Sequence, residues 1–119
     1  MQVSVTAKQG VHGGARVVGT LTSSGTHNIM FTGWDFSGRT LKAFLSSSTG
    51  AALTDETAVS TIHGGRAAVV DLPTGSDTML STISGHSSID AFICLKATDS
   101  PATFFCKAPV VVGATPSIS

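Results

Sequence analysis

The chain has 119 residues, with seven basic and seven acidic side chains and a formal net charge of zero. This length suits one domain and is too short for two ordinary ones. The balanced charge argues against a nucleic-acid-binding protein, which usually carries a clustered basic excess. Charged residues make up only 12% of the chain, and a surface this poor in charge favours association with neighbouring molecules.

No apolar run approaches the ~18 to 20 residues that a membrane span requires. The first six residues, Met-Gln-Val-Ser-Val-Thr, lack the basic and apolar regions of a secretory signal. We therefore expect a soluble chain that starts at its own initiator methionine and has neither nucleic acid nor membrane as a partner.

Alternating apolar and polar residues predict a strand at the start of the chain, where Val3, Val5 and Ala7 share one face. Turn-forming residues separate the later runs. These runs predict strands over 15–22, 28–31, 41–45, 57–62, 66–72, 89–97 and 103–112. In two of them the apolar faces are formed by Leu41, Ala43 and Leu45, and by Ala68, Val70 and Leu72.

The segment after Pro73 predicts the single helix. Met79, Leu80 and Ile83 fall at helical spacing, Ser76 is a suitable N-cap and Gly85 is suitable just beyond the C-terminal end. Because serine and threonine in its interior are weak helix formers, we expect the helix to depend on packing Leu80 and Ile83 against the ends of the sheet.

Seven to eight short strands with one connecting helix predict an all-β fold, a two-sheet antiparallel sandwich. The sandwich is expected to span residues 1–112. Residues 113–119 show no pattern and are expected to form a flexible C-terminal arm.

The two cysteines, Cys94 and Cys106, flank a predicted hairpin turn. If Thr98 pairs with Ala102, the cysteines lie opposite each other with Cα atoms about 4.5–5.5 Å apart, which a disulfide can bridge. Such a bridge would add modest stability to an already paired hairpin, and the lack of a secretory signal indicates a reducing compartment. We expect two free buried thiols, with the disulfide as the alternative.

No pattern predicts a metal or a cofactor. Zinc sites need three or four ligands at short paired spacings, whereas the histidines are isolated. They are His12, His27, His63 and His86. The glycine-rich stretches 10–14 and 63–66 do not lead from a strand into a helix, so they do not predict a phosphate site.

The sequence does not predict an enzyme. The stretch His86-Ser87-Ser88-Ile89-Asp90 contains the residue types of a catalytic triad, but a triad is defined by geometry in space. Asp55 and Glu56 are neighbours and would point in different directions, whereas acid–base pairs flank a cleft. A hydrolase based on His63 or His86 is therefore the last of the alternatives.

Trp34 and Phe36 form a possible ligand platform, on which a saccharide would stack. A single tryptophan in a domain of this size is more typical of a core anchor between sheets. The chain has no tyrosine, a residue common on binding surfaces that use rigid amphipathic rings.

Three blocks together resemble the N-terminal domains of phage baseplate upper proteins and related tail-fibre modules. They are WDFSGRTLKAFLSSSTG, GGRAAVVDLPTGSDTMLSTISG and SSIDAFICLKATDSPATFFCKAPVVV. The resemblance lies in the order of strand, turn, helix and final hairpin rather than in fixed residues, and it covers residues 28–112.

The resemblance implies an immunoglobulin-like β-sandwich in a phage virion, made in the host bacterial cytoplasm. Such a protein would act without catalysis, as a homo-oligomer in contact with other virion proteins. Edge strands such as Val3–Ala7 and Val110–Val112 would extend a neighbour's sheet.

Family members usually continue into a stalk or receptor-binding region, which this sequence lacks. A short tail, baseplate or fibre-attachment adaptor is therefore expected. The alternatives are a capsid decoration protein and a stand-alone carbohydrate-binding module, with a host surface glycan as a possible further partner.

Overall fold

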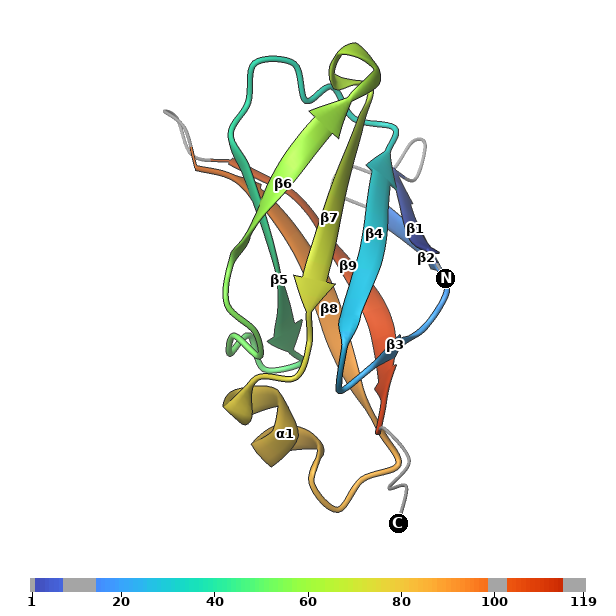
Figure 1. Cartoon of the computed structure of the whole chain (residues 1–119), viewed down its shortest axis with the longest axis vertical. Coiled ribbons are helices and arrows are strands. Elements are labelled where there is room, and N and C mark those ends of the chain that lie inside the picture. Colours follow the sequence, from blue (N-terminus) through green and yellow to red (C-terminus); the bar gives the residue numbers. More distant parts are fainter. Residues whose placement is uncertain (1, 8–14, 99–102, 115–119) are drawn as a thin grey trace.

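The structure, a computed structural model, describes residues 2–7, 15–98 and 103–114 (Figure 1). Nine strands, one 3-10 turn and one helix lie within these ranges. In chain order they are β1 (Gln2–Ala7), β2 (Ala15–Val18), β3 (Leu21–Thr22), β4 (Thr26–Thr32), β5 (Leu41–Ser47), β6 (Thr57–Ile62), η1 (His63–Gly65), β7 (Ala67–Pro73), α1 (Asp77–Ile83), β8 (Ser88–Ala97) and β9 (Thr103–Gly113). The prediction of an all-β fold with one short helix is confirmed.

The strands form one curled mixed sheet in the order β2-β1-β4-β7-β6-β5-β8-β9-β3. Strand β6 joins its two halves, because residues 57–59 pair with β5 and residues 60–62 pair with β7. The sheet thereby folds back on itself, and its halves lie over each other (Figure 1). Two strand pairs, β1–β4 and β3–β9, are parallel, so the predicted purely antiparallel arrangement of seven to eight strands is wrong.

The additional strand arises because the run predicted over residues 15–22 is divided at Gly19. This glycine has a φ of +120°, and a β-carbon on it would lie 3.2 Å from Cγ2 of Val3. Strand β2 pairs with β1 in one half of the sheet, whereas β3 pairs with β9 in the other. The chain therefore changes halves near Gly19, and β4 returns to lie parallel to β1.

The core lies between the two halves and follows the alternation in the sequence. The faces predicted for β5 and β7 are both buried, which confirms those assignments. The inward side chains of these two strands are Leu41, Ala43 and Leu45 on β5 and Ala68, Val70 and Leu72 on β7. The largest fully buried side chains include Phe31 and Phe36, so the aromatic centre of the core comes from the end of β4 and the loop that follows.

Helix α1 begins and ends as its sequence predicts. The Ser76 side chain caps it by accepting the backbone N–H of Met79 at 3.1 Å, and Gly85, at φ +82°, follows its C-terminal end. Its packing differs from the prediction, because Met79 and Ile83 are buried whereas Leu80 is 47% exposed. A helix of seven residues turns only one side to the sheet ends, and that side carries Met79 rather than Leu80.

The sheet extends further toward the C-terminus than the sequence predicted. Strand β9 runs to Gly113, whose carbonyl accepts the N–H of Ser23 at 2.9 Å. The N–H of Ala114 donates to the carbonyl of Ser87 at 2.9 Å. Residues 113 and 114 of the predicted arm are thus hydrogen-bonded to neighbouring segments, and its remaining residues, 115–119, lie outside the described ones.

Candidate functional site

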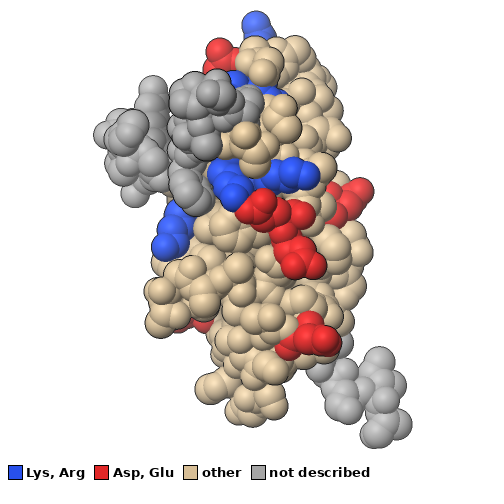
Figure 2. All heavy atoms as spheres, turned by 90° about the vertical axis from the view of Figure 1, so that its left-hand side faces the viewer, with Lys and Arg blue, Asp and Glu red and all other residues tan. Residues whose placement is uncertain are grey.

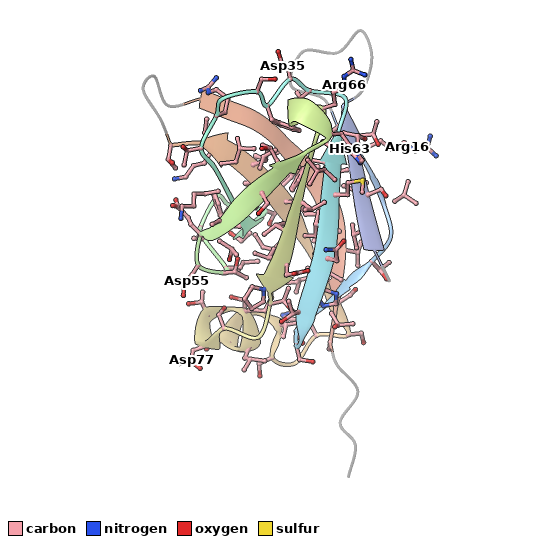
Figure 3. All side chains as sticks on the ribbon, turned by 45° about the horizontal axis from the view of Figure 1, so that its top comes forward. Arg16, Asp35, Asp55, His63, Arg66 and Asp77 are labelled. Atoms are coloured by element: carbon pink, nitrogen blue, oxygen red, sulfur yellow. The ribbon has the colours of Figure 1, made fainter. Side chains whose placement is uncertain are left out.

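One end of the molecule is built from two segments that are distant in the sequence. The loop after β4 contains Trp34, Asp35 and Ser37, and the turn between β6 and β7 contains Gly64 and Arg66. Together with Gly33 these residues line a shallow hollow that is open to solvent. Figure 3 shows Asp35, His63 and Arg66 at this end, and Asp55 and Asp77 at the opposite one. We call this hollow the tip hollow.

Backbone contacts hold the two segments of the tip hollow together. The N–H of Phe36 donates to the carbonyl of Gly65 at 2.8 Å, and the Ser37 hydroxyl donates to the carbonyl of Gly64 at 3.2 Å. A β-carbon at Gly65 would lie 2.7 Å from the backbone N of Ser37, so only glycine permits this approach. Gly65 also has a φ of +91°, in the region that favours glycine. The turn glycines predicted in this stretch therefore bring the two loops into contact.

The two aromatic residues of the predicted platform have different roles. Phe36 has no exposed surface, so it is a core residue and the prediction that it contributes to a platform is wrong. Trp34 packs against the core but remains partly exposed. Its ring centroid lies 6.0 Å from that of Phe36 at an interplanar angle of 41°. The buried phenyl ring thus supports an indole ring that borders the tip hollow.

The carboxylate of Asp35 is held in a defined position at the rim. One of its oxygens accepts the backbone N–H of Ser37 at 3.0 Å. The hydrogen bond from the Ser37 backbone N–H is the largest cause that holds the pKa of Asp35 below its ordinary value. Asp35 is exposed and remains ionised at neutral pH, with lone pairs left to accept further donors.

The cysteines are not a direct cross-strand pair. The register predicted from the turn holds where Lys96 lies opposite Phe104, but a bulge then shifts it by one residue. Lys107 therefore lies opposite Cys94, and Cys106 lies opposite Leu95. Cys94 is a free buried thiol, 3.5 Å from the hydroxyl of Ser46. The Cys106 side chain lies outside the described part of the chain.

The histidines occupy separate places. His27 lies on β4, and its Nε2 atom lies 3.2 Å from both the Thr22 hydroxyl and the carbonyl of Ser24, which precedes the strand. His63 lies in the turn after β6 and His86 in the loop after α1, while His12 lies outside the described residues. Across the described ranges, no three side chains of His, Cys, Asp or Glu come together in a way that could hold a metal ion.

The acidic neighbours Asp55 and Glu56 lie in the loop before β6. Glu56 forms an ion pair with Lys96 of β8, and Asp55 is exposed and lines a different hollow beside Ser76. Asp90, in the predicted His-Ser-Asp stretch, is exposed on β8, and its carboxylate has no described partner. The structure therefore shows no converging acid–base arrangement of these residues in the parts that it describes.

The outer face of β5 and β8 carries aromatic rings covered by lysines. Phe44 lies opposite Cys94 in the register. The Nζ atom of Lys96 lies 5.7 Å from the ring centroid of Phe44, and that of Lys107 lies 4.7 Å from the ring centroid of Phe92, both within the range of cation–π attraction. Figure 2 shows basic and acidic side chains gathered near the middle of one face of the molecule, and a mostly uncharged surface around them.

A second hollow, the β2–β9 groove, lies where these two strands approach each other. Its apolar lining includes Val17 from β2, Phe92 from β8, and Pro109 and Val111 from β9. Val111 is 47% exposed, and Val18, also on β2, is 57% exposed. These valines are two of the three large apolar side chains that the described residues expose, the third being Leu80.

The predicted edge strands differ from the observed ones. Strand β1 lies between β2 and β4, so the prediction that Val3–Ala7 forms an edge is wrong. Strand β9 pairs with β3 only at Val112 and Gly113. Within the described chain, Val110 and Val111 are therefore paired on one side alone, next to the β2–β9 groove.

Comparison with known proteins returned no match, either among the protein-family models or among the curated proteins. No helix in the described ranges is both long enough and apolar enough to cross a bilayer. The function is therefore inferred from the two surface features, the tip hollow and the β2–β9 groove, and from the resemblance in the sequence.

Proposed function

We propose that the chain is a structural subunit of a bacteriophage virion, a small adaptor that joins tail, baseplate and fibre components without catalysing a reaction. The order of its strands, helix and final hairpin supports this role by resemblance to baseplate and tail-fibre domains. The two halves of the curled sheet, which enclose one core, support the assignment to an immunoglobulin-like sandwich.

The observation that carries the proposal is the exposed apolar lining of the β2–β9 groove. Val111 is 47% exposed at the groove, and Val17, Phe92 and Pro109 continue the apolar surface around it. Contiguous exposed apolar surface with polar residues around it marks a protein contact site. Three polar residues at the groove, Thr20, Ser48 and Asp90, give it such a border.

The occupant that we propose for the β2–β9 groove is the same groove of a second copy. A chain with a net charge of zero and 12% charged residues has little electrostatic repulsion to keep copies apart. Symmetric pairing of one apolar patch with itself is the commonest form of association among soluble oligomers. The other surfaces of such an oligomer remain available for further virion proteins.

Two experiments test the two parts of this proposal. Mass spectrometry of purified particles is expected to detect the chain, and its absence from them would eliminate a virion role. Sedimentation velocity is expected to show an oligomer for the unmodified chain. A chain that stays monomeric throughout the micromolar range would eliminate self-association.

Val111→Lys tests the groove directly. Burying an uncompensated lysine at a contact is strongly unfavourable. We therefore expect the dissociation constant of the oligomer to rise about tenfold or more, which corresponds to ~1.4 kcal/mol. Ser60→Lys is the matched control, because Ser60 is exposed on β6 and does not line the groove. Equal sedimentation of the two variants would contradict the groove contact.

A further inference from the structure

We infer that the tip hollow binds a saccharide that carries a carboxylate, with Trp34 as the stacking surface, Arg66 as the partner of the ligand's carboxylate and Asp35 as an acceptor for its hydroxyl groups. This site shares no lining residue with the β2–β9 groove. The inference therefore does not depend on the proposed oligomer.

The tip hollow is preorganised, which is the first requirement of a binding site on loops. Its two segments are joined through the Phe36–Gly65 backbone hydrogen bond of 2.8 Å and the Ser37–Gly64 hydrogen bond of 3.2 Å. Since Gly65 has no side chain, its segment lies directly against the backbone of Ser37. Binding would thus cost little ordering of the backbone.

Trp34 supplies an aromatic surface of restricted orientation. Its indole ring is packed against the core and against Phe36, with ring centroids 6.0 Å apart, and part of it faces the hollow. No described side-chain nitrogen is both buried and without a hydrogen-bond partner, so the indole N–H of this partly exposed residue, which has no partner among the described residues, remains accessible to a ligand. A saccharide on this ring places C–H groups on the electron-rich face and offers hydroxyl oxygens to the N–H.

Two groups of opposite charge line the same hollow without neutralising each other. Arg66 and Asp35 form no ion pair in the described chain, and the Arg66 guanidinium, which is exposed, has no other partner there. Figure 3 shows both side chains directed away from the body of the molecule. A guanidinium presents a fork of donors that matches a carboxylate, while an ionised Asp35 can only accept.

This combination favours an acidic saccharide over other ligands. An apolar ligand would leave both charged groups unused, and a simple anion would leave the indole ring unused and approach Asp35. A uronic acid offers a carboxylate for Arg66, hydroxyl donors for Asp35 and a C–H face for Trp34. The hollow is shallow and open, which suits a terminal sugar that stays partly hydrated.

The chain contains a single tryptophan and no tyrosine, so its intrinsic fluorescence reports on the tip hollow alone. The experiment is a fluorescence titration of the full chain with methyl glucuronide, and with methyl glucoside as the matched neutral probe. We expect a saturable change with the glucuronide, with a dissociation constant on the order of 1 mM, and at least about tenfold weaker binding of the glucoside. In two-dimensional NMR the Trp34 indole N–H resonance should shift along the same titration.

Variants separate this site from unspecific effects. Arg66→Gln is expected to weaken glucuronide binding about tenfold or more, whereas Arg16→Gln, which removes the same charge from exposed β2, should leave it unchanged. Asp35→Asn should weaken binding, and Asp77→Asn at the opposite end of the molecule should not. No saturable change with the glucuronide, equal affinity for the glucoside, or undiminished binding by Arg66→Gln would each overturn the inference.

Discussion

Replacing Gly65 by alanine tests how the two loops of the tip hollow are held together. Two costs add at this position. An L-residue at φ +91° pays about 1–2 kcal/mol for a left-handed backbone. The new β-carbon would also lie 2.7 Å from the backbone N and 2.8 Å from the Cα of Ser37, and relieving such overpacking costs about 1–3 kcal/mol. We therefore expect Gly65→Ala to lower the free energy of unfolding by about 2–5 kcal/mol.

The adjacent glycine provides the matched control. Gly64 has a φ of +69°, and a β-carbon on it would meet nothing within 4 Å, so Gly64→Ala should cost only the backbone term of about 1–2 kcal/mol. Urea unfolding followed by far-UV circular dichroism measures the free energy of unfolding of both variants, and its dependence on urea concentration should keep the same slope in each. Equal losses of stability for the two variants would refute the contact between Gly65 and the Ser37 backbone.

Three further predictions concern single side chains. Ser76→Ala removes the N-cap of α1 and the hydroxyl that donates to the Leu53 carbonyl, and it should lower the free energy of unfolding in urea by about 1–2 kcal/mol. Ser81→Ala, on the exposed side of α1, is the control, and an equal loss of stability in that variant would argue against the cap. The Asp35 carboxyl resonance should titrate below the ordinary aspartate pKa of 3.8 in an NMR pH titration, and titration at or above that value would contradict the hydrogen bond from the Ser37 backbone. Because the pKa is lowered in the folded protein, this carboxylate stabilises the fold above the unfolded pKa, and the contribution is lost as the pH falls through the folded pKa. A soluble thiol reagent should label Cys94 only after unfolding, because its side chain is buried; mass spectrometry that finds Cys94 labelled in the folded protein would contradict this position.

Local patterns in the sequence predicted the elements but not their assembly. The alternation of apolar and polar residues predicted the inward faces of β5 and β7 correctly, and Ser76 and Gly85 marked the two ends of α1. The division of one run at Gly19 was not predictable, because it depends on which half of the sheet each piece joins. The parallel pairing of β1 with β4 depends in the same way on contacts between distant segments.

The candidate site was predicted only in part, for the same physical reason. Trp34 and Phe36 were predicted together as a possible platform, with a core anchor as the more typical role of a single tryptophan. In the structure Trp34 is partly exposed, whereas Phe36, two residues later, faces the core. Nothing local indicated that the turn containing Gly64 and Arg66 would meet the Trp34 loop, since this depends on backbone hydrogen bonds across the end of the sheet. The bulge that separates Cys94 from Cys106 in the register also lacks a local signal.

The most direct test of the proposed function is electron microscopy of the phage particle at a resolution that traces the chain. The account predicts copies of this subunit between tail, baseplate or fibre components, with Val111 and the rest of the β2–β9 groove covered by a second copy. A particle without this chain, or one in which that groove faces solvent in every copy, would contradict the account.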